Sequence, residues 1–161
     1  MISVVIPTLN AEATLAPTLA ALVPAAVEGI VREVIVVDAG STDQTLRIAD
    51  GCGAEVMQSK GGRGAQLAAG AARAKFPWLL FLHADSVLES GWEHDAAKLM
   101  ERVDGERLPP TAAAFGYALD DMGAAPRLLE TAVRLRCAAL KLPYGDQGLL
   151  IPRALYQEIG G

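Results

Sequence analysis

The sequence predicts an α/β domain in which helices flank a mainly parallel β-sheet. Short runs of apolar and β-branched residues alternate along the chain with alanine-rich segments of helical length, and this alternation is typical of βα units. The strand-like runs are continuously apolar, as buried parallel strands are. A chain of 161 residues is long enough to bury one such core, so we expect a single domain spanning residues 1–161.

Each expected strand is a short apolar run bounded by turn-forming residues. The best-defined runs read ISVVI, EVIVV and WLLFL. Pro77 directly precedes the last of these, where its missing N–H does least harm to strand pairing. The expected strands are residues 2–6, 33–37, 55–58, 78–82 and 112–119, with 148–151 as a sixth candidate.

The segments between the strands carry apolar residues near helical spacing. Asp43 is a good N-cap for the second helix, and Ser41 is also better explained as a capping residue than as a ligand contact. The sequence GERLPP at 105–110 is the clearest internal break, and we interpret it as a loop between the two halves 1–104 and 111–161. The expected helices are residues 11–22, 43–51, 63–75, 91–103 and 126–141, and 155–161 indicates a further helix and its exit.

The composition excludes several classes of protein. The chain has a formal charge of −5, so no general electrostatic field attracts nucleic acid or an anionic membrane. Its two cysteines, Cys52 and Cys137, lack the spacing and the neighbouring histidines of a zinc site, which fits a reducing, cytoplasmic location. No run approaches the roughly 20 apolar residues of a membrane-spanning helix, and residues 2–6 are too short for a signal peptide. We expect no transmembrane segment, and any membrane contact would be peripheral.

Polar residues follow three of the expected strands. Ligands of parallel α/β sheets bind beyond the carboxyl ends of the strands, so we expect these three ends to meet at one edge. Asp38 follows the second strand, where its carboxylate can accept hydrogen bonds from a base N–H or a ribose hydroxyl, or can simply form a turn. The three segments are PTLN at 7–10, DAGSTD at 38–43 and HADS at 83–86.

Asp85 is the candidate metal ligand. It follows an apolar strand, and Mg²⁺ and Mn²⁺ commonly use only one or two protein carboxylates together with substrate phosphates. A metal held there would neutralise a diphosphate leaving group, while a helix or turn cap is the structural alternative. His83 could orient Asp85, bind the metal itself, or be a histidine satisfied at the sheet edge.

Two cations and three glycines come together in KGGRG at 60–64, directly before an expected helix. Because helix N-termini attract anions, this segment is a candidate phosphate cradle. Its spacing matches neither a Walker A loop nor GxGxxG, and a plain turn explains it equally well. Arg63 is the stronger candidate of the two cations, since its guanidinium can bind phosphate bidentately.

The later part of the chain carries two weaker candidates. The loop YGDQG at 144–148 places the carboxylate of Asp146 beside the amide of Gln147, a pattern that by itself indicates a turn. The preceding helical segment carries four basic residues, which more often form a solvated face than a patch for an acceptor or a membrane surface. These residues are Arg127, Arg134, Arg136 and Lys141.

Four motifs, in order, resemble the family 2 glycosyltransferases of the Rossmann-like GT-A fold. They read VVIPTLNAEATL, VIVVDAGSTDQT, LLFLHADS and GDQGLLIPRALYQEIGG, and they span nearly the whole chain. The chain is most similar to a bacterial subgroup with HAD followed by Ser or Thr and a later GDQ loop, the selenium-domain-associated transferases. The resemblance implies an enzyme that moves a sugar, with inversion, from a nucleoside-diphosphate sugar to an acceptor, using Mg²⁺ or Mn²⁺.

The resemblance also implies roles for individual residues. Asp85 would hold the metal on the diphosphate, and Arg63 would lie near the nucleotide. The donor site would occupy the half 1–104, and the acceptor side would begin in the half 111–161, with Asp146 and Gln147. The expected donor-binding residues are Pro7, Thr8, Asn10, Glu12, Asp38, Arg63, His83 and Ala84.

Two features depart from the family pattern. His83 stands where the DxD-type motif usually has its first acidic residue. The family's general base, which takes the proton of the acceptor hydroxyl, belongs to an ED-like motif some way after the Gly-Gly that is here Gly160-Gly161. No catalytic base is therefore expected within the 161 residues, and Asp146 is a weak substitute. We expect the chain to be truncated at its C-terminus; the alternative is a nucleotide-sugar-binding module without transferase activity.

Two other enzyme classes fit the sequence poorly. The first strand is followed by PTLN. Nucleotidyltransferases of similar architecture have a glycine-rich loop with Arg and Lys at this point, and NAD-dependent enzymes have GxGxxG. The nucleotide, the sugar, the acceptor and the oligomeric state are left open by the sequence.

Overall fold

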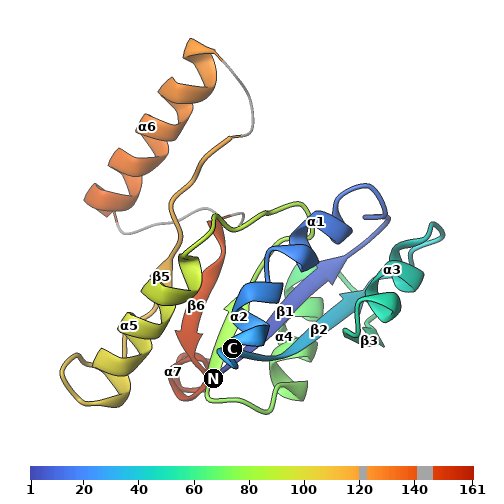
Figure 1. The fold of residues 1–161 in the computed structure, drawn as a ribbon, viewed down its shortest axis with the longest axis horizontal. Helices are drawn as coiled ribbons and strands as arrows, with labels where there is room; N and C mark the ends of the chain where they lie inside the picture. The colour runs from blue at the N-terminus through green and yellow to red at the C-terminus, as the bar shows by residue number, and fades with distance from the viewer. Residues whose placement is uncertain (120–122, 141–146) are drawn as a thin grey trace.

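The protein folds as an α/β domain around a six-stranded sheet. The computed structural model describes residues 1–119, 123–140 and 147–161. The strands, in their order across the sheet, are β3 (Glu55–Gln58), β2 (Val31–Asp38), β1 (Ile2–Thr8), β4 (Trp78–Phe81), β6 (Leu149–Pro152) and β5 (Ala113–Ala114). Figure 1 shows helices on both sides of this sheet. Strands β1, β2, β3 and β4 run parallel, while β6 runs antiparallel to both of its neighbours. The predicted fold class, a mainly parallel GT-A-like sheet flanked by helices, is confirmed.

The first four strands form where apolar runs predicted them. All seven residues of β1 are buried, because β1 lies at the centre of the sheet between β2 and β4. Thr8 pairs with Asp38 at the ends of β1 and β2, which brings the polar residues after both strands to one edge. The parallel strands are β1 (Ile2–Thr8), β2 (Val31–Asp38), β3 (Glu55–Gln58) and β4 (Trp78–Phe81).

Two apolar cores lie on opposite faces of the sheet because successive side chains of a strand point in opposite directions. Val4 and Ile6 of β1 belong to one core, which also contains side chains of α1 (Leu15–Ala20), α2 (Val23–Val27), α3 (Thr45–Gly51) and α5 (Trp92–Asp104). Val5 belongs to the other, with side chains of α4 (Arg63–Arg73) and α7 (Arg153–Glu158). The sheet is therefore the middle of three layers.

The predicted helix 11–22 is shorter than expected and is followed by a second short helix. Helix α1 begins only at Leu15, and α2 contains Pro24 in its first turn, a position where proline is tolerated. The N–H groups of Ala11 and Glu12 donate instead to side chains of Thr45 and Asp43. Ala11 and Glu12, at the start of the predicted helix, therefore connect the loop after β1 to the loop after β2.

Helix α4 packs closely against the sheet at a glycine. A Cβ atom added to Gly70 would lie 2.3 Å from Cγ1 of Val5 and 3.0 Å from Cγ2 of Val37. Any larger side chain at this position would therefore push α4 away from β1 and β2. The helix begins at Arg63, directly beside the carboxyl ends of these strands.

The last third of the chain departs most from the prediction. Of the predicted strand 112–119, only β5 (Ala113–Ala114) pairs with β6 (Leu149–Pro152). Beyond it, residues up to Tyr117 line a hollow beside α6 (Ala124–Leu140), so this apolar run faces a helix rather than another strand. Figure 1 shows α6 standing clear of the main body.

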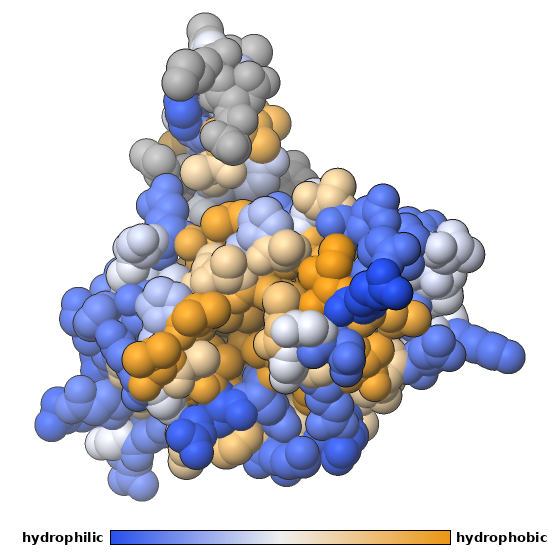
Figure 2. Space-filling model, turned by 45° about the vertical axis from the view of Figure 1, so that its right-hand side comes forward, coloured by the Kyte–Doolittle hydropathy of each residue, from blue (hydrophilic) through white to orange (hydrophobic). Residues whose placement is uncertain are grey.

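Some large apolar side chains remain on the surface. Val27 is 82% exposed, and Leu128 and Leu135 on α6 are 73% and 65% exposed. On the face drawn in Figure 2, an apolar area crosses the middle and is bordered by hydrophilic side chains. Exposed apolar areas commonly mark surfaces for contact with other molecules or other parts of a protein. None of the helices in the described part of the chain has the length and apolar character needed to cross a membrane.

Candidate functional site

A cleft of about 450 Å³ opens at the carboxyl ends of the parallel strands. The chain leaves β1 toward β2 on one side and reaches β4 on the other, so this is the switch point at which doubly wound sheets bind ligands. The volume lies within the range of small-molecule sites. The cleft is lined by Pro7, Thr8, Leu9, Asn10, Ala11, Thr14, Ala39, Gly61, Gly62, Arg63, Gln66, His83, Ala84 and Asp85.

Seven of the residues predicted for the donor and metal sites are brought together in this cleft. They come from three separate parts of the sequence. They meet because β1 and β4 are adjacent strands and because α4, which begins at Arg63, packs against β1 and β2. Glu12 and Asp38 do not line the cleft. The seven are Pro7, Thr8, Asn10, Arg63, His83, Ala84 and Asp85.

Asp38 is completely buried beneath the cleft. Its Oδ1 accepts hydrogen bonds from the hydroxyls of Thr8 (3.0 Å) and Ser41 (2.5 Å). Its Oδ2 accepts from the backbone N–H groups of Gly40 and Ser41, both at 2.8 Å. The carboxylate thus fixes the turn after β2, and a base or ribose could contact it only by displacing one of these four donors.

The charge of Asp38 is stabilised in place. Burial by itself raises the pKa of this carboxyl, but the hydrogen bonds from Ser41, Gly40 and Thr8 outweigh it and lower the pKa below its ordinary value. Asp38 is therefore ionised at neutral pH and holds the loop as a charged acceptor. The predicted contact between Asp38 and the donor stays a prediction, whereas its turn-forming role is visible directly.

Asn10 and Glu12 join the loop after β1 to the loop after β2. Asn10 has a positive φ of 52°, and its Oδ1 accepts from the N–H of Thr42 at 2.9 Å while its own N–H donates to Ser41 Oγ at 2.8 Å. The Glu12 carboxylate accepts from the N–H of Gln44 at 2.9 Å. One wall of the cleft is therefore cross-linked before any ligand arrives.

Asp43 supports the start of α3, although the N-cap of this helix is Gln44 and not Asp43 as the sequence predicted. Its Oδ1 accepts from the N–H of Thr45, the first residue of the helix, at 2.9 Å. Ser41 does not cap this helix in the described structure, because its hydroxyl donates to Asp38 and accepts from Asn10. The capping role predicted for Ser41 is wrong, since the geometry of the turn directs its side chain toward Asp38.

Gln66 is a cleft residue that the sequence analysis missed. Its amide nitrogen donates to the carbonyls of Thr8 (2.9 Å) and Val37 (2.7 Å), so it joins the ends of β1 and β2. The side chain is buried. One signal was present in the sequence, because Gln66 follows Arg63 by three residues in the same expected helix and therefore shares its face.

Arg63, His83 and Asp85 form a connected chain across the cleft. Nη2 of Arg63 lies 2.5 Å from Nε2 of His83, and Nδ1 of His83 contacts Oδ1 of Asp85. A guanidinium can only donate, so Nε2 of His83 accepts, and Nδ1 carries the ring proton and donates to Asp85. Of the three roles open to His83, orientation of Asp85 is the one that this geometry displays.

The Asp85 carboxylate fits a divalent cation at the mouth of the cleft. Its side chain is 55% exposed, and its Oδ2 accepts no hydrogen bond from the described residues. No cluster of three metal-ligating side chains lies in the described part of the cleft. A metal bound to Asp85 would therefore take its other ligands from phosphate oxygens and water, as Mg²⁺ and Mn²⁺ readily do.

The backbone around Ala84 and the start of α4 complete the site. The carbonyl of Ala84 accepts from the buried hydroxyl of Thr18 at 3.0 Å, which anchors the loop that carries Asp85. Gly61 and Gly62 lead into α4, and the N-terminus of this eleven-residue helix faces the cleft. Helix N-termini favour anions, so this end of α4 supports the predicted phosphate cradle. Lys60, the other cation of the segment, does not line the cleft.

Gln147 lies elsewhere, in a second hollow of about 570 Å³ between β5 and α6. Its Nε2 donates to the carbonyl of Phe115 at 3.0 Å, and its Oε1 accepts from Sγ of Cys137 at 3.3 Å. This hollow shares no lining residue with the first cleft. Asp146 lies outside the described residues, so the predicted acceptor-side pair stays a prediction.

The cleft combines a cation on a helix N-terminus, an exposed carboxylate and a rigid polar wall. Together with the switch-point position, these features define a doubly wound α/β domain suited to a phosphorylated ligand with a bound divalent cation. The Glycosyl transferase family 2 profile matches residues 3–118, more than half of the chain. The protein belongs to glycosyl transferase family 2.

Solved structures agree with this assignment. Glucosyl-3-phosphoglycerate synthase from Mycobacterium tuberculosis in complex with Mn²⁺ and UDP-glucose is 25% identical, with a TM-score of 0.67 over 96% of this chain and 57% of that one. Its complex with Mg²⁺ and UDP gives 26% identity and a TM-score of 0.65 over the same shares. S. aureus TarS 1–349 has a TM-score of 0.70 at 20% identity, over 98% of this chain and 48% of that one, and shows the fold alone. No match was found among curated proteins.

The chain spans a little over half of the length of the mycobacterial synthase. The family profile covers the residues that line the cleft, since it matches residues 3–118, and the structural similarity includes 96% of the present chain. The synthase binds a uridine nucleotide together with Mn²⁺ or Mg²⁺, the same two classes of ligand that the cleft residues predict.

Proposed function

We propose that the protein transfers a sugar, with inversion, from a nucleoside-diphosphate sugar to an acceptor and that donor binding depends on Mg²⁺ or Mn²⁺. Membership of family 2 supports a glycosyltransferase. The observation that carries the donor assignment is the meeting of Arg63, Asp85 and the N-terminus of α4 in one cleft. The negative charge of a diphosphate has to be balanced by positive groups. The cleft supplies the Arg63 guanidinium, the N-terminus of α4 and the Asp85 carboxylate, which would bind a cation.

Each group has a defined task in this proposal. Asp85 holds the metal, which when bound neutralises the charge that develops on the departing diphosphate. Arg63 binds a phosphate oxygen, and His83 keeps the Asp85 carboxylate turned into the cleft. Thr8 and Asn10 face the nucleoside, on a wall that is already cross-linked and therefore loses little entropy when the donor binds.

A second candidate function is donor binding without transfer. An inverting transfer needs a base near the acceptor hydroxyl, and Asp85 is the only carboxylate among the described residues that line the cleft. Because Asp85 is committed to His83 and the metal, it is poorly placed to accept that proton as well. This observation favours the binding-only alternative for the 161-residue chain, while the family favours transfer.

Donor binding is tested by titrating UDP, GDP and dTDP, without metal and with Mn²⁺ or Mg²⁺, and measuring affinity by calorimetry and stability by thermal unfolding. We expect at least one nucleotide to bind more tightly with Mn²⁺. At 100 times Kd it should stabilise the fold by about 2.7 kcal/mol. Asp85→Asn should remove the effect of Mn²⁺, because the metal loses its only protein carboxylate in the described cleft.

The variant Arg63→Gln should weaken nucleotide binding by about tenfold, the loss of roughly 1.4 kcal/mol. Arg73→Gln is the matched control, since Arg73 lies on the same helix but pairs with Glu55 on the surface. Equal losses in the two variants would show that only general charge matters. Failure of every nucleotide to bind with either metal would refute the donor site.

Turnover separates the two candidate functions. Release of sugar from the bound donor, or its transfer to an added acceptor, would establish catalysis if Asp85→Ala abolished it. Tight, metal-dependent binding with no turnover would support the binding module. The finer assignments belong to the same proposal: membership of the HAD and GDQ subgroup, a donor half at 1–104, an acceptor side from 111 to 161 and a cytoplasmic location.

A further inference from the structure

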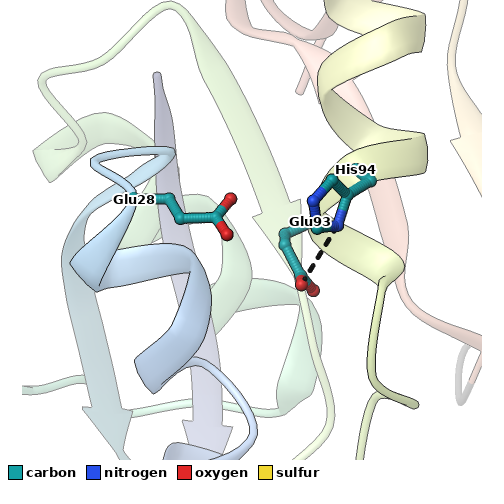
Figure 3. Close-up of side chains that lie close together, drawn as sticks. All are labelled: Glu28, Glu93 and His94. Carbon is teal, nitrogen blue, oxygen red and sulfur yellow. Dashed lines mark ion pairs between the residues drawn. The ribbon is translucent and has the colours of Figure 1, made fainter.

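Three metal-ligating side chains meet on the far side of the domain from the α4 helix. Glu28 directly follows α2, and Glu93 and His94 lie in the first turn of α5. One ligand atom from each lies within 4.8 Å of the other two. Figure 3 shows the Glu28 carboxylate extending from α2 toward the side chains of Glu93 and His94. None of the three lines the donor cleft.

Glu93 is unusual because it is a buried carboxylate with an unsatisfied oxygen. Its side chain is only 7% exposed, and its Oε2 is the single buried side-chain polar atom without a hydrogen-bond partner in the described structure. Buried carboxylates are normally paired, hydrogen-bonded or bound to a metal. Its position in the first turn of α5 is favourable for a negative charge but leaves this oxygen without a donor.

The neighbouring side chains of the cluster do not supply the missing partner of Glu93 Oε2. Nδ1 of His94 lies 3.3 Å from Oε1 of Glu93, so even a protonated His94 would satisfy the other oxygen. Glu28 adds a second carboxylate within 4.8 Å, which increases the local negative charge. A cation between the three side chains would satisfy Oε2 and offset the repulsion between the two carboxylates at once.

We propose that Glu28, Glu93 and His94 form a binding site for a divalent transition-metal ion, and that Zn²⁺ fits it best. One imidazole and two carboxylates are a normal ligand set for Zn²⁺, with water as the fourth ligand. Ligand atoms about 2.0–2.2 Å from a tetrahedral ion lie about 3.3–3.6 Å apart. Nδ1 of His94 and Oε1 of Glu93 are already 3.3 Å apart, and an ion at this spacing would reach Oε2 as the second oxygen of the same carboxylate.

Closing the site requires only small side-chain movements. The three ligand atoms already lie within 4.8 Å of one another, so each pair has to approach by at most about 1.5 Å to reach tetrahedral spacing. Glu28 is exposed, so its side chain can rotate without disturbing the core. The bound ion would join the end of α2 to the start of α5, next to Trp92, whose indole N–H already donates to the carbonyl of Ala21 at 3.2 Å. The site is structural and independent of the donor cleft.

Calorimetric titration of metal-free protein with Zn²⁺ tests the proposal. We expect one saturable ion and a rise in melting temperature. His94→Gln and Glu28→Gln should each weaken binding by at least about tenfold, since even loss of a residue behind a metal ligand costs 10–100-fold. Both side chains are exposed, so these variants should fold even if Glu93→Gln does not.

Two control variants locate the ion. Asp95→Asn removes a neighbouring carboxylate of α5 that pairs with Lys98 on the surface, and it should leave Zn²⁺ affinity unchanged. Asp85→Asn disables the candidate metal ligand of the cleft and should also leave it unchanged. The proposal is overturned if no ion saturates, or if binding is lost in Asp85→Asn but retained in both His94→Gln and Glu28→Gln.

Discussion

Removal of the Asp38 carboxylate tests whether this residue organises the cleft wall by its hydrogen bonds. Asp38→Ala deletes the acceptor for four hydrogen bonds and leaves the hydroxyl of Thr8, which is 2% exposed, without a partner. A hydrogen bond to a charged group contributes about 1.5–3 kcal/mol, and a stranded buried donor costs about 1–3 kcal/mol. The N–H groups of Gly40 and Ser41 can regain water in the exposed loop. We therefore expect the free energy of unfolding to fall by about 3–4 kcal/mol.

Asp38→Asn separates the shape of the acceptor from its charge. The amide oxygen can still accept from Gly40 and Ser41, while the amide nitrogen donates to the hydroxyls of Thr8 and Ser41, which rotate to accept. Neutral hydrogen bonds are about half as strong as charged ones. The expected loss for Asp38→Asn is accordingly about 1–2 kcal/mol at neutral pH.

The same carboxyl predicts a pH dependence. Its pKa is lowered in the folded state, because the hydrogen bonds outweigh the effect of burial. Its contribution to stability is therefore complete above the unfolded pKa, about 3.9, and is lost as the pH falls through the lowered folded value. The stability difference between the native protein and Asp38→Asn should shrink as the pH is lowered from 6 to 3.

Urea denaturation followed by circular dichroism, at a series of pH values, measures these quantities. Nucleotide affinity measured on the same variants shows whether the conformation of the loop after β2 affects binding in the cleft. A loss below about 1 kcal/mol for Asp38→Ala, or a difference for Asp38→Asn that stays constant down to pH 3, would refute this account of the carboxylate.

Three further predictions concern the same wall and the helix behind it. Gly70→Ala should lower the free energy of unfolding by about 2 kcal/mol, because its Cβ would lie 2.3 Å from Val5. The control is Gly64→Ala on the same helix, where a Cβ has no atom within 4 Å; it should raise the free energy of unfolding by up to about 1 kcal/mol. Urea denaturation compares the two variants. Gln66→Leu should lower the free energy of unfolding by about 2–3 kcal/mol, because the carbonyls of Thr8 and Val37 lose their hydrogen-bond donor. Amide exchange at the ends of β1 and β2 should become faster. Unchanged exchange would contradict this role of Gln66. Asn10→Ala should lower the free energy of unfolding by about 1–2 kcal/mol, because alanine disfavours the positive φ and the hydrogen bond to Thr42 is lost. Asn10→Gly should lose less stability, because glycine adopts this φ freely. Equal losses of stability in a thermal melt would exclude backbone strain.

Local patterns were sufficient for most of the fold. The runs ISVVI, EVIVV and WLLFL became central strands because a continuously apolar segment can be buried on both faces only inside a covered sheet. The predicted helix at 63–75 formed as α4 for a similar reason, since its buried residues lie on the face toward the sheet. These outcomes depend on residues that are close in sequence.

Long-range geometry decided what the sequence analysis missed. The strand predicted at 112–119 has only two paired residues, because β6 offers it just Leu149 and Leu150. Gln66 acts on two carbonyls that are 29 and 58 residues away. Glu93 lies in the first turn of a helix, and its sequence neighbours do not show that it is buried and lies near Glu28, which is 65 residues away in the sequence.

The sequence by itself determined the order of strands and helices and the polar residues that end three of the strands. Those features follow from local periodicity and from the rule that ligands bind at the carboxyl ends of parallel strands. Only the tertiary structure decided how each polar residue is used. Asp38 is enclosed by four hydrogen bonds below the cleft, whereas Asp85 is exposed at its mouth. Both aspartates follow apolar strands, and they differ because burial and hydrogen bonding are set by neighbours distant in sequence.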